Sequence, residues 1–442
     1  MLCRYANCIA LVFLSLLLLI PLGFLSADAD QTPASSSTPQ TEQSQPSPER
    51  TAPLTLTLGD AVKRGLQSNA TVQASNARVQ AANARLRAAV VQQNPFLTLA
   101  HGWGNSNTAG LDEDIILAQV FTLGVKHSAP IRAAMSERDA AVMDKRSVEL
   151  SLTLTIETAY LSAVQANHEY ANAEKALRTA QAFANAARIR FEAGDVARDQ
   201  VVRSQIEVNT AQQALTNAAG ARVNRETELK SLLGVPKEQA VDLTESLSIP
   251  QVSCQLSSLI NYGLANRPDL RSTQLLVEAR RFDVRAARAL STPDAFIELR
   301  RRSIDPAIAG GSIRVGVILP LFDLGARRAQ VSLSRANEAE QRANLAEIQR
   351  VATVEITTGW QSLEDARKVL QSFQTGRLAQ ARELLDMAQL GYEHGASSYI
   401  ELLDAQRAYR DEQANYLRAL VSYRLALSSL QRAVGGALPC GQ

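Results

Sequence analysis

The stretch LGYEHGASSYIELLDAQRAY, residues 390–409, marks a sharp turn between two helical segments. A mostly polar helical pattern ends at Gly395, and a second helix begins almost at once with Glu401 and Asp404 in its first turns. Glycine suits the left-handed conformation that ends one helix and lets the next begin. We therefore predict a helical hairpin whose tip lies at Gly395.

The same turn occurs earlier in the chain, because FEAGD at 191–195 matches YEHGA at 392–396. Further matches keep the same order: Gly65 with Gly263, FTLG ending at Gly124 with FDLG ending at Gly325, and Gly234 with Gly435. A period of about 200 residues is far too long for a solenoid unit. We infer a tandem duplication with a first repeat at 54–235, a linker at 236–255, a second repeat at 256–436 and a tail at 437–442.

The composition excludes several classes of protein. The chain has 442 residues and a net charge of +2, which is too balanced to indicate a nucleic-acid partner or an acidic substrate. Hydrophobic residues make up 46% but aromatic residues only 5%, and much of the apolar content is alanine. Alanine favours close-packed helices over a thick globular core.

The N-terminus indicates export. Arg4 precedes an apolar run at 9–25, and the following SADAD offers small residues at Ala27 and Ala29. We interpret 1–29 as a cleaved secretory signal peptide, with an uncleaved anchor as the alternative. The segment 30–53 is rich in Ser, Thr, Gln and Pro, so we interpret it as a disordered tether.

Each repeat has the same predicted plan. An amphipathic helix, 58–93 or 256–291, is followed by two short strands and then by a very long helix, 130–193 or 326–394. About 65 helical residues span roughly 95 Å. After the glycine turn a shorter helix returns to Gly234 or Gly435. The two shorter helices of a repeat together are slightly longer than the long one, so they can stack end to end beside it.

The strands of the second repeat, AFIELRRR and SIRVGVIL, alternate between apolar and charged residues. This period of two is typical of a half-buried strand, and the length is near that of a tilted transmembrane strand. Charges in hydrocarbon would be costly, so we predict one face toward lipid and one toward a water-filled lumen. The lipid-facing set is Ile297, Leu299, Ile313, Val315 and Val317, and the lumen-facing set is Glu298, Arg300 and Arg314.

Four strands in one chain cannot close a barrel with a usable lumen. A bilayer tolerates only closed barrels, because edge N–H and C=O groups find no partner there. Several chains must then share one barrel: two chains give eight strands and a filled interior, and three give twelve and a pore. The alternative is a soluble helical protein with two surface hairpins.

With these features the chain resembles the TolC-like outer-membrane efflux family over nearly everything after the tether. The resemblance is carried by NRPDL at 266–270, LPLFDLG at 319–325 and GYEHGASSYIELLDAQRAY, in that order and within the duplication. It implies a mainly α fold with a small β part, in which three chains form an α-helical tunnel in the periplasm and share a 12-stranded transmembrane β-barrel. It also implies a periplasmic adaptor and an inner-membrane transporter as partners.

The resemblance also implies roles for the hairpin tips. The turns at Gly194 and Gly395 would form the periplasmic entrance, and Glu401 and Asp404 match the positions of the family's acidic entrance rings. The simpler interpretation is that these two acids keep an exposed helix start soluble and complement its dipole. Hydrogen bonds of Tyr392 with Asp199 or Gln200, across the hairpin pair, are expected to hold the tip shut. Ser397 at the tip turn stands where family members can carry an arginine, so the resemblance does not extend to a charged lock.

Two cysteines follow the signal segment, Cys254 and Cys440. Both lie beyond helix ends that are expected to meet near the middle of the tunnel, in an oxidising compartment. We predict a disulfide between them; the alternative is two unpaired thiols on a linker and a tail.

Catalytic and cofactor motifs are absent from the sequence. We find no P-loop, no dinucleotide-binding glycines and no CxxC pair, and the four histidines are scattered. We therefore predict no enzyme activity, no cofactor and no metal site.

The predicted function is a passive outer-membrane exit duct, for which a partner supplies the energy. The alternative is a structural periplasmic coiled-coil protein without channel activity. The segment ILAQVFTLGVKHSAPIRAA is similar to the metal-efflux branch but departs from it at GVKH, so the substrate stays open.

Overall fold

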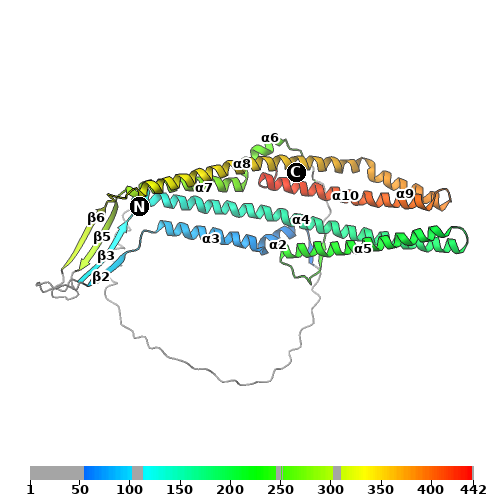
Figure 1. Cartoon of the computed structure of the whole chain (residues 1–442), viewed down its shortest axis with the longest axis horizontal. Coiled ribbons are helices and arrows are strands. Elements are labelled where there is room, and N and C mark those ends of the chain that lie inside the picture. The colour runs from blue at the N-terminus through cyan, green and yellow to red at the C-terminus, as the bar shows by residue number, and fades with distance from the viewer. Residues whose placement is uncertain (1–53, 102–112, 245–249, 251, 302–309, 441–442) are drawn as a thin grey trace, which may run out of the picture. The chain divides into compact units, whose positions relative to one another are not determined.

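The computed structural model describes residues 54–101, 113–244, 250, 252–301 and 310–440. The predicted signal peptide and tether, 1–29 and 30–53, lie outside the described residues. The described residues form long helices and a four-stranded sheet (Figure 1). The predicted mainly α fold with a small β part is therefore confirmed. No described helix is both long and apolar enough to cross a membrane.

The first repeat is built around one long helix. Its elements in chain order are β1 (Leu54–Leu56), α2 (Leu58–Ser68), α3 (Ala70–Val90), β2 (Phe96–His101), β3 (Glu113–Phe121), α4 (Val125–Glu192), α5 (Arg198–Leu233) and β4 (Val241–Leu243). Helix α4 has 68 residues, or roughly 100 Å. Helices α3 and α5 pack against α4, and α2 contacts α5. The shorter helices thus lie end to end beside the long one, as predicted.

The second repeat follows the same order. Its elements are α6 (Leu256–Asn266), α7 (Pro268–Arg288), the 3-10 turn η1 (Ala289–Ser291), β5 (Asp294–Arg301), β6 (Gly311–Ile318), α8 (Ala326–Ser372), the π-helical turn η2 (Phe373–Arg377), α9 (Leu378–Glu393) and α10 (Tyr399–Val434). Helix α7 packs between α4 and α8, and α10 packs on α8 and α9 (Figure 1). The two repeats are therefore joined side by side through α4 and α7.

The prediction of single helices at 58–93 and 256–291 was wrong, because each is two helices. Asn69 is extended and its side-chain oxygen accepts a hydrogen bond from Thr71 N at 2.9 Å, so it ends α2 and caps α3. In the second repeat Arg267 is extended before Pro268. A residue before proline is disfavoured in the helical region, which explains the break there.

Two further predictions of helix bounds were wrong. Helix α4 begins at Val125, five residues before Pro130. The predicted helix 326–394 is interrupted at η2, where Gly376 has φ 119°. The interval from Gly194 to Gly395 is one residue longer than that from Ile156 to Ile356, which fits an extra residue at this turn. A π-turn is the usual way for a helix to absorb one inserted residue.

An isoleucine set against a glycine forms the joint at the middle of each repeat. Ile156 of α4 and Ile356 of α8 are fully buried. A Cβ atom at Gly65 or at Gly263 would overlap the Cδ1 atom of the respective isoleucine. Leu233 in the first repeat and Val434 in the second also lie within 4 Å of such a Cβ atom. The duplication thus recurs as a matching pair of packed joints.

A glycine beside this joint gives a test of the packing. Gly435 has φ 95°, and a Cβ there would lie 2.9 Å from Arg267 Cα. Gly395 has φ 76° with no atom within 4 Å of a Cβ. Both Gly→Ala changes carry a left-handed strain of about 1–2 kcal/mol. We expect Gly435→Ala to lower the thermal unfolding midpoint clearly more than Gly395→Ala, because only the former meets backbone. Equal midpoints for the two variants would contradict this packing.

Candidate functional site

Strands from both repeats form one antiparallel sheet. The strand order is β2-β3-β5-β6, so a hairpin from the first repeat lies beside a hairpin from the second. Within the described residues no strand pairs with the outer edge of β2 or of β6. Both edges therefore carry backbone N–H and C=O groups without a partner strand, which is a template for pairing with another chain.

One face of this sheet is mostly apolar and exposed. Ile297 pairs with Val315 and Leu299 with Ile313, so these four side chains share a face. Their exposed fractions, with that of Val317, are 39% for Ile297, 76% for Val315, 40% for Leu299, 70% for Ile313 and 62% for Val317. The row of Leu299 continues onto the first repeat through Leu117 and Leu97. The next row on this face holds Leu99, Ile115 and the polar Arg301, and Gln119 lies beside Ile297. An exposed apolar face of this extent indicates an apolar surrounding or a partner.

The opposite face carries charges that are paired with one another. Glu298 and Arg314 lie opposite each other, and Arg314 Nη2 donates to Glu298 Oε1 at 2.7 Å. Arg300 Nε donates to Asp114 Oδ1 at 2.9 Å, which links the two hairpins. The structure thus separates the two predicted sets of residues onto opposite faces. Which of the faces meets lipid remains a prediction.

Each helical hairpin turns at the predicted glycine. Gly194 and Gly395 have φ values of 85° and 76°, in the left-handed region. Helix α10 then begins with a capping box, in which Ser398 Oγ accepts from Glu401 N at 3.3 Å and Ser398 N donates to Glu401 Oε2 at 2.8 Å. Ser397 lies against Gly391 of α9, where even a Cβ atom would overlap its side chain. This close approach keeps the turn narrow.

The two predicted entrance acids differ in their surroundings. The Glu401 carboxylate is engaged in the capping box, which is the simpler role that the sequence allowed for it. The Asp404 side chain is 68% exposed and lies 4.0 Å from Arg407 Nη1. Asp404 is therefore the freer of the two charges. Asp199, at the start of α5, lies 3.6 Å from Arg203 Nε.

Tyr392 contacts the other hairpin through a cation rather than through Asp199 or Gln200. The Arg190 guanidinium of α4 lies 5.0 Å from the centre of the Tyr392 ring. The centre of the Tyr399 ring lies 6.2 Å from that of Tyr392. Among the described residues no hydrogen bond joins Tyr392 to Asp199 or Gln200, so the expected contact across the hairpin pair stays a prediction.

A buried carboxylate between the hairpins was missed in the sequence. Glu207 of α5 has a side chain only 7% exposed, and it accepts hydrogen bonds from Arg407 and Arg410 of α10. Burial and the nearby Glu207 charge raise the pKa of Tyr399, so its hydroxyl stays neutral. The only sequence signal was a pair of arginines at i and i+3. No local pattern indicates that their partner lies in the preceding repeat.

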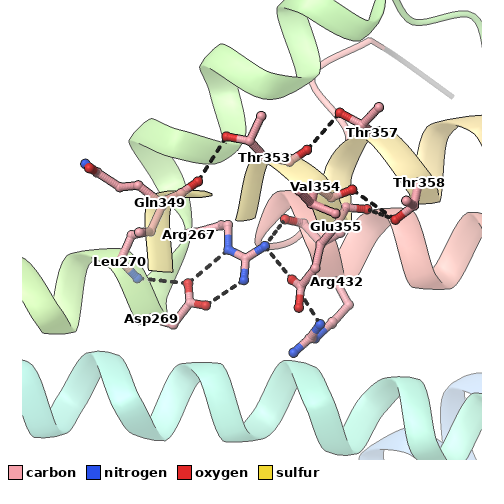
Figure 2. Close-up of polar contacts among 11 residues, drawn as sticks. Arg267, Asp269, Leu270, Gln349, Thr353, Val354, Glu355, Thr357, Thr358 and Arg432 are labelled. Carbon is pink, nitrogen blue, oxygen red and sulfur yellow. Dashed lines mark hydrogen bonds and ion pairs between the residues drawn. The ribbon is translucent and has the colours of Figure 1, made fainter. Parts of the chain in front are cut away.

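A second polar cluster holds the joint of the second repeat (Figure 2). Arg267, whose side chain is 5% exposed, pairs with Asp269 at 2.6 Å and with Glu355 of α8 at 2.7 Å. Its Nη1 also donates to Ala433 O at 2.9 Å, at the end of α10. The cluster thus ties α7, α8 and α10 together. The first repeat has Asn69 in the corresponding place and no such ion cluster among its described residues.

This cluster shifts the pKa of Asp269. Burial alone would raise it, but the hydrogen bond and charge of Arg267, with a hydrogen bond from Leu270 N, hold it below its usual value. The folded protein then binds fewer protons than the unfolded chain at moderately acidic pH. The ionised Asp269 carboxylate therefore stabilises the fold above its unfolded-state pKa, near 4, and this stabilisation is lost as pH falls through the lower pKa of the folded state.

We expect Asp269→Asn to lose less stability than the wild type as the pH is lowered. The thermal unfolding midpoint of the wild type would fall as pH drops below about 4, and that of the variant would fall less, because it has one titrating group fewer. Asp386→Asn is the control, since Asp386 is 51% exposed in an ion pair within α9. Parallel pH curves for wild type and Asp269→Asn would show that the cluster does not contribute in this way.

A known protein family matches both repeats of the chain. The family model described as outer membrane efflux protein matches residues 61–235 and 259–436. The pyoverdine export outer membrane protein OpmQ of Pseudomonas putida is 24% identical over 319 residues, which cover 69% of this chain and 66% of OpmQ. The outer membrane efflux protein BepC of Brucella suis is 25% identical over 370 residues, 80% of each chain.

A solved structure has the same fold. The CmeC outer membrane channel of Campylobacter jejuni superposes with a TM-score of 0.72 at 18% identity and covers 86% of this chain and 85% of CmeC. At this identity the likeness establishes the fold and nothing further.

Proposed function

Because the chain belongs to the outer membrane efflux protein family, we propose that it is a passive outer-membrane exit duct. The observation that carries the proposal is the sheet with two open edges and one exposed apolar face. A bilayer accepts such a sheet only when its edges are closed by further strands. A structural coiled-coil protein in the aqueous periplasm does not require an exposed apolar sheet face, so we favour the duct over that alternative.

The open edges support a homotrimer with a shared barrel. We propose that β6 of one chain pairs with β2 of the next, which gives twelve strands from three chains and a lumen wide enough for solutes. The predicted lipid-facing set then lies outside. The ion-paired set, Glu298, Arg314, Arg300 and Asp114, lines the lumen.

The helices support the same assembly. Helix α7 is covered by both α4 and α8, so its Ser272 and Ala279 are only 1% and 0% exposed. Helix α3 is the corresponding element of the first repeat, but it packs mainly on α4. Its uncovered face is a row of exposed alanines with alternating spacings of four and three: Ala70, Ala74, Ala77, Ala81, Ala84 and Ala88. This spacing suits close helix packing.

Helix α8 offers the matching surface. The start of α4 is covered by α7, with Ala129, Ala133 and Ala140 at most 5% exposed. The start of α8 is covered by α7 on one side, where Ser334 is 6% exposed, but its other side is open, and Leu333 is 54% exposed. We propose that α8 of one chain packs on α3 of the next as α4 packs on α7 within a chain. Three copies then close a ring of alternating repeats.

The hairpin tips would form the entrance of the tunnel. Three-fold symmetry would arrange Glu401 and Asp404 as two rings of three carboxylates, which attract cations. We further propose that a periplasmic adaptor and an inner-membrane transporter deliver the substrate, because the sequence holds no nucleotide-binding motif. Export of pyoverdine by OpmQ is stated in that protein's name, and the substrate of this chain stays open.

Planar-bilayer recording tests the duct and its entrance together. We expect the purified trimer to conduct ions with a preference for cations. In the variant Glu401→Ala with Asp404→Ala, we expect weaker cation preference and weaker block by trivalent cations. Glu364→Ala with Asp365→Ala in α8 removes two charges about 45 Å along the helices from the tip and serves as control. An absence of conductance would reject the duct, and unchanged selectivity would place both acids on the outer surface.

The orientation of the sheet is tested by a pair of neighbouring residues. We expect Val315→Arg to reduce the trimer yield in native mass spectrometry strongly, because a charge on the lipid face costs about 2–4 kcal/mol at the membrane midplane. Arg314→Ala removes a lumen charge and is expected to assemble nearly as well as the wild type. Equal yields, or a protein that stays monomeric in mild detergent, would contradict the assignment.

A further inference from the structure

The first repeat is closed at its middle by a strand pair. Strand β1, just before α2, pairs in parallel with β4, which follows α5. Leu56 lies opposite Leu243 in this pair. Tyr160 of α4 donates its hydroxyl to Leu56 O at 2.9 Å. The entrance and exit of the repeat are thereby fastened to each other and to the long helix.

The corresponding segment of the second repeat has no partner strand among the described residues. Residues 252–254 precede α6 as β1 precedes α2. Trp360 Nε1 of α8 donates to Cys254 O at 3.2 Å. The hydroxyl of Tyr423 in α10 donates to Pro250 O at 2.5 Å, and Val252 is buried. The segment is therefore held by side chains, and among the described residues no backbone ladder links it to residues 435–440, which follow α10.

The disulfide Cys254–Cys440 supplies that link. Its Cα atoms are 5.7 Å apart, and Cys440 follows α10. When Gly65 is aligned with Gly263, Leu56 of the first repeat is equivalent to Cys254 of the second. When Ile156 is aligned with Ile356, Tyr160 is equivalent to Trp360. The aromatic donor and its backbone acceptor thus recur in both repeats. What differs is the closure, a strand pair in one and a covalent bond in the other.

We propose that the Cys254–Cys440 disulfide replaces the β1–β4 pair as the closure of the second repeat, and that this closure is consequently redox-dependent in the second repeat alone. The proposal rests on the proposed function only in that the joint faces an oxidising exported compartment. Both cysteines are partly exposed, so small thiols and disulfides have access to them.

The chemistry is ordinary thiol–disulfide exchange with a disulfide donor of that compartment. The thiolate of one cysteine attacks a donor sulfur, which breaks the donor S–S bond and releases one donor thiol. The second cysteine attacks the mixed disulfide, forms the Cys254–Cys440 bond and releases the second donor thiol. The two protons end on the donor thiols, and the donor takes up the two electrons. A dithiol reductant reverses the sequence.

Reduction is expected to loosen a defined region. Val252, Leu259 and Ile356 belong to one buried cluster that Cys254 and Cys440 pack against. Freeing residues 252–254 from the chain after α10 removes one wall of the Gly263–Ile356 joint. The strand pair of the first repeat contains no cysteine, so its joint keeps its closure.

Hydrogen–deuterium exchange of the intact trimer, with and without a dithiol reductant, tests this proposal. We expect amides in 252–266 to exchange at least about tenfold faster after reduction and alkylation. Amides in 54–68, the matching part of the first repeat, act as the internal control and keep their rate. Cys254→Ser with Cys440→Ser is expected to show the fast rate without reductant and no response to it.

Three results would overturn the proposal. The first is two free thiols in the intact mass before reduction. The second is an unchanged rate in 252–266 once both thiols are alkylated. The third is equal acceleration in 54–68, which would make the bond a general staple of the whole chain. Hydrogen exchange is measured independently of ion conductance. A trimer that does not conduct ions would therefore contradict the proposed duct function but would not affect this test of the disulfide.

Discussion

The packing of one isoleucine against one glycine holds the middle of each repeat, and the other elements depend on it. Ile156 and Ile356 come from the long helices, and Gly65 and Gly263 from the short helices that enter each repeat. Helices approach this closely only where one of them lacks a side chain. The joint sets where the returning helix ends, and the strand pair, the disulfide and the Arg267 cluster all lie around it.

Unsatisfied surfaces explain why a single copy of this outer membrane efflux protein is incomplete. Among the described residues its sheet has two open edges, its α3 has an uncovered row of alanines, and the start of α8 is covered by α7 on one side only. The internal duplication suggests how each of these three surfaces is covered. Because the two repeats are similar, a contact between repeats within one chain can also form between repeats of two neighbouring chains. In the proposed assembly one set of residue patterns thus serves both folding and association.

The two repeats have diverged where they close and where they bend. Only the second carries the π-turn at Gly376, the buried Arg267 cluster and the disulfide among the described residues. Between the hairpins, Glu207 pairs with two arginines of the other repeat. An unpaired charge at that depth would be costly, so the pairing fixes how the hairpins lie against each other.

The sequence by itself determined the duplication, the helical hairpins with their glycine tips and the alternating strands, because these depend on local periodicity and on turn chemistry. It also placed Cys254 and Cys440 at matching ends, where the structure joins them. Only the tertiary structure decided the short β1–β4 pair and the partners of Glu207 and Arg267. The breaks at Asn69 and Arg267 have local causes that we missed in the sequence, a side-chain cap at Asn69 and Pro268 after Arg267. Three-residue strands such as β1 and β4 carry almost no periodic signal. Partners more than 80 residues away, such as Arg267 and Glu355, are brought together by packing that no local pattern records.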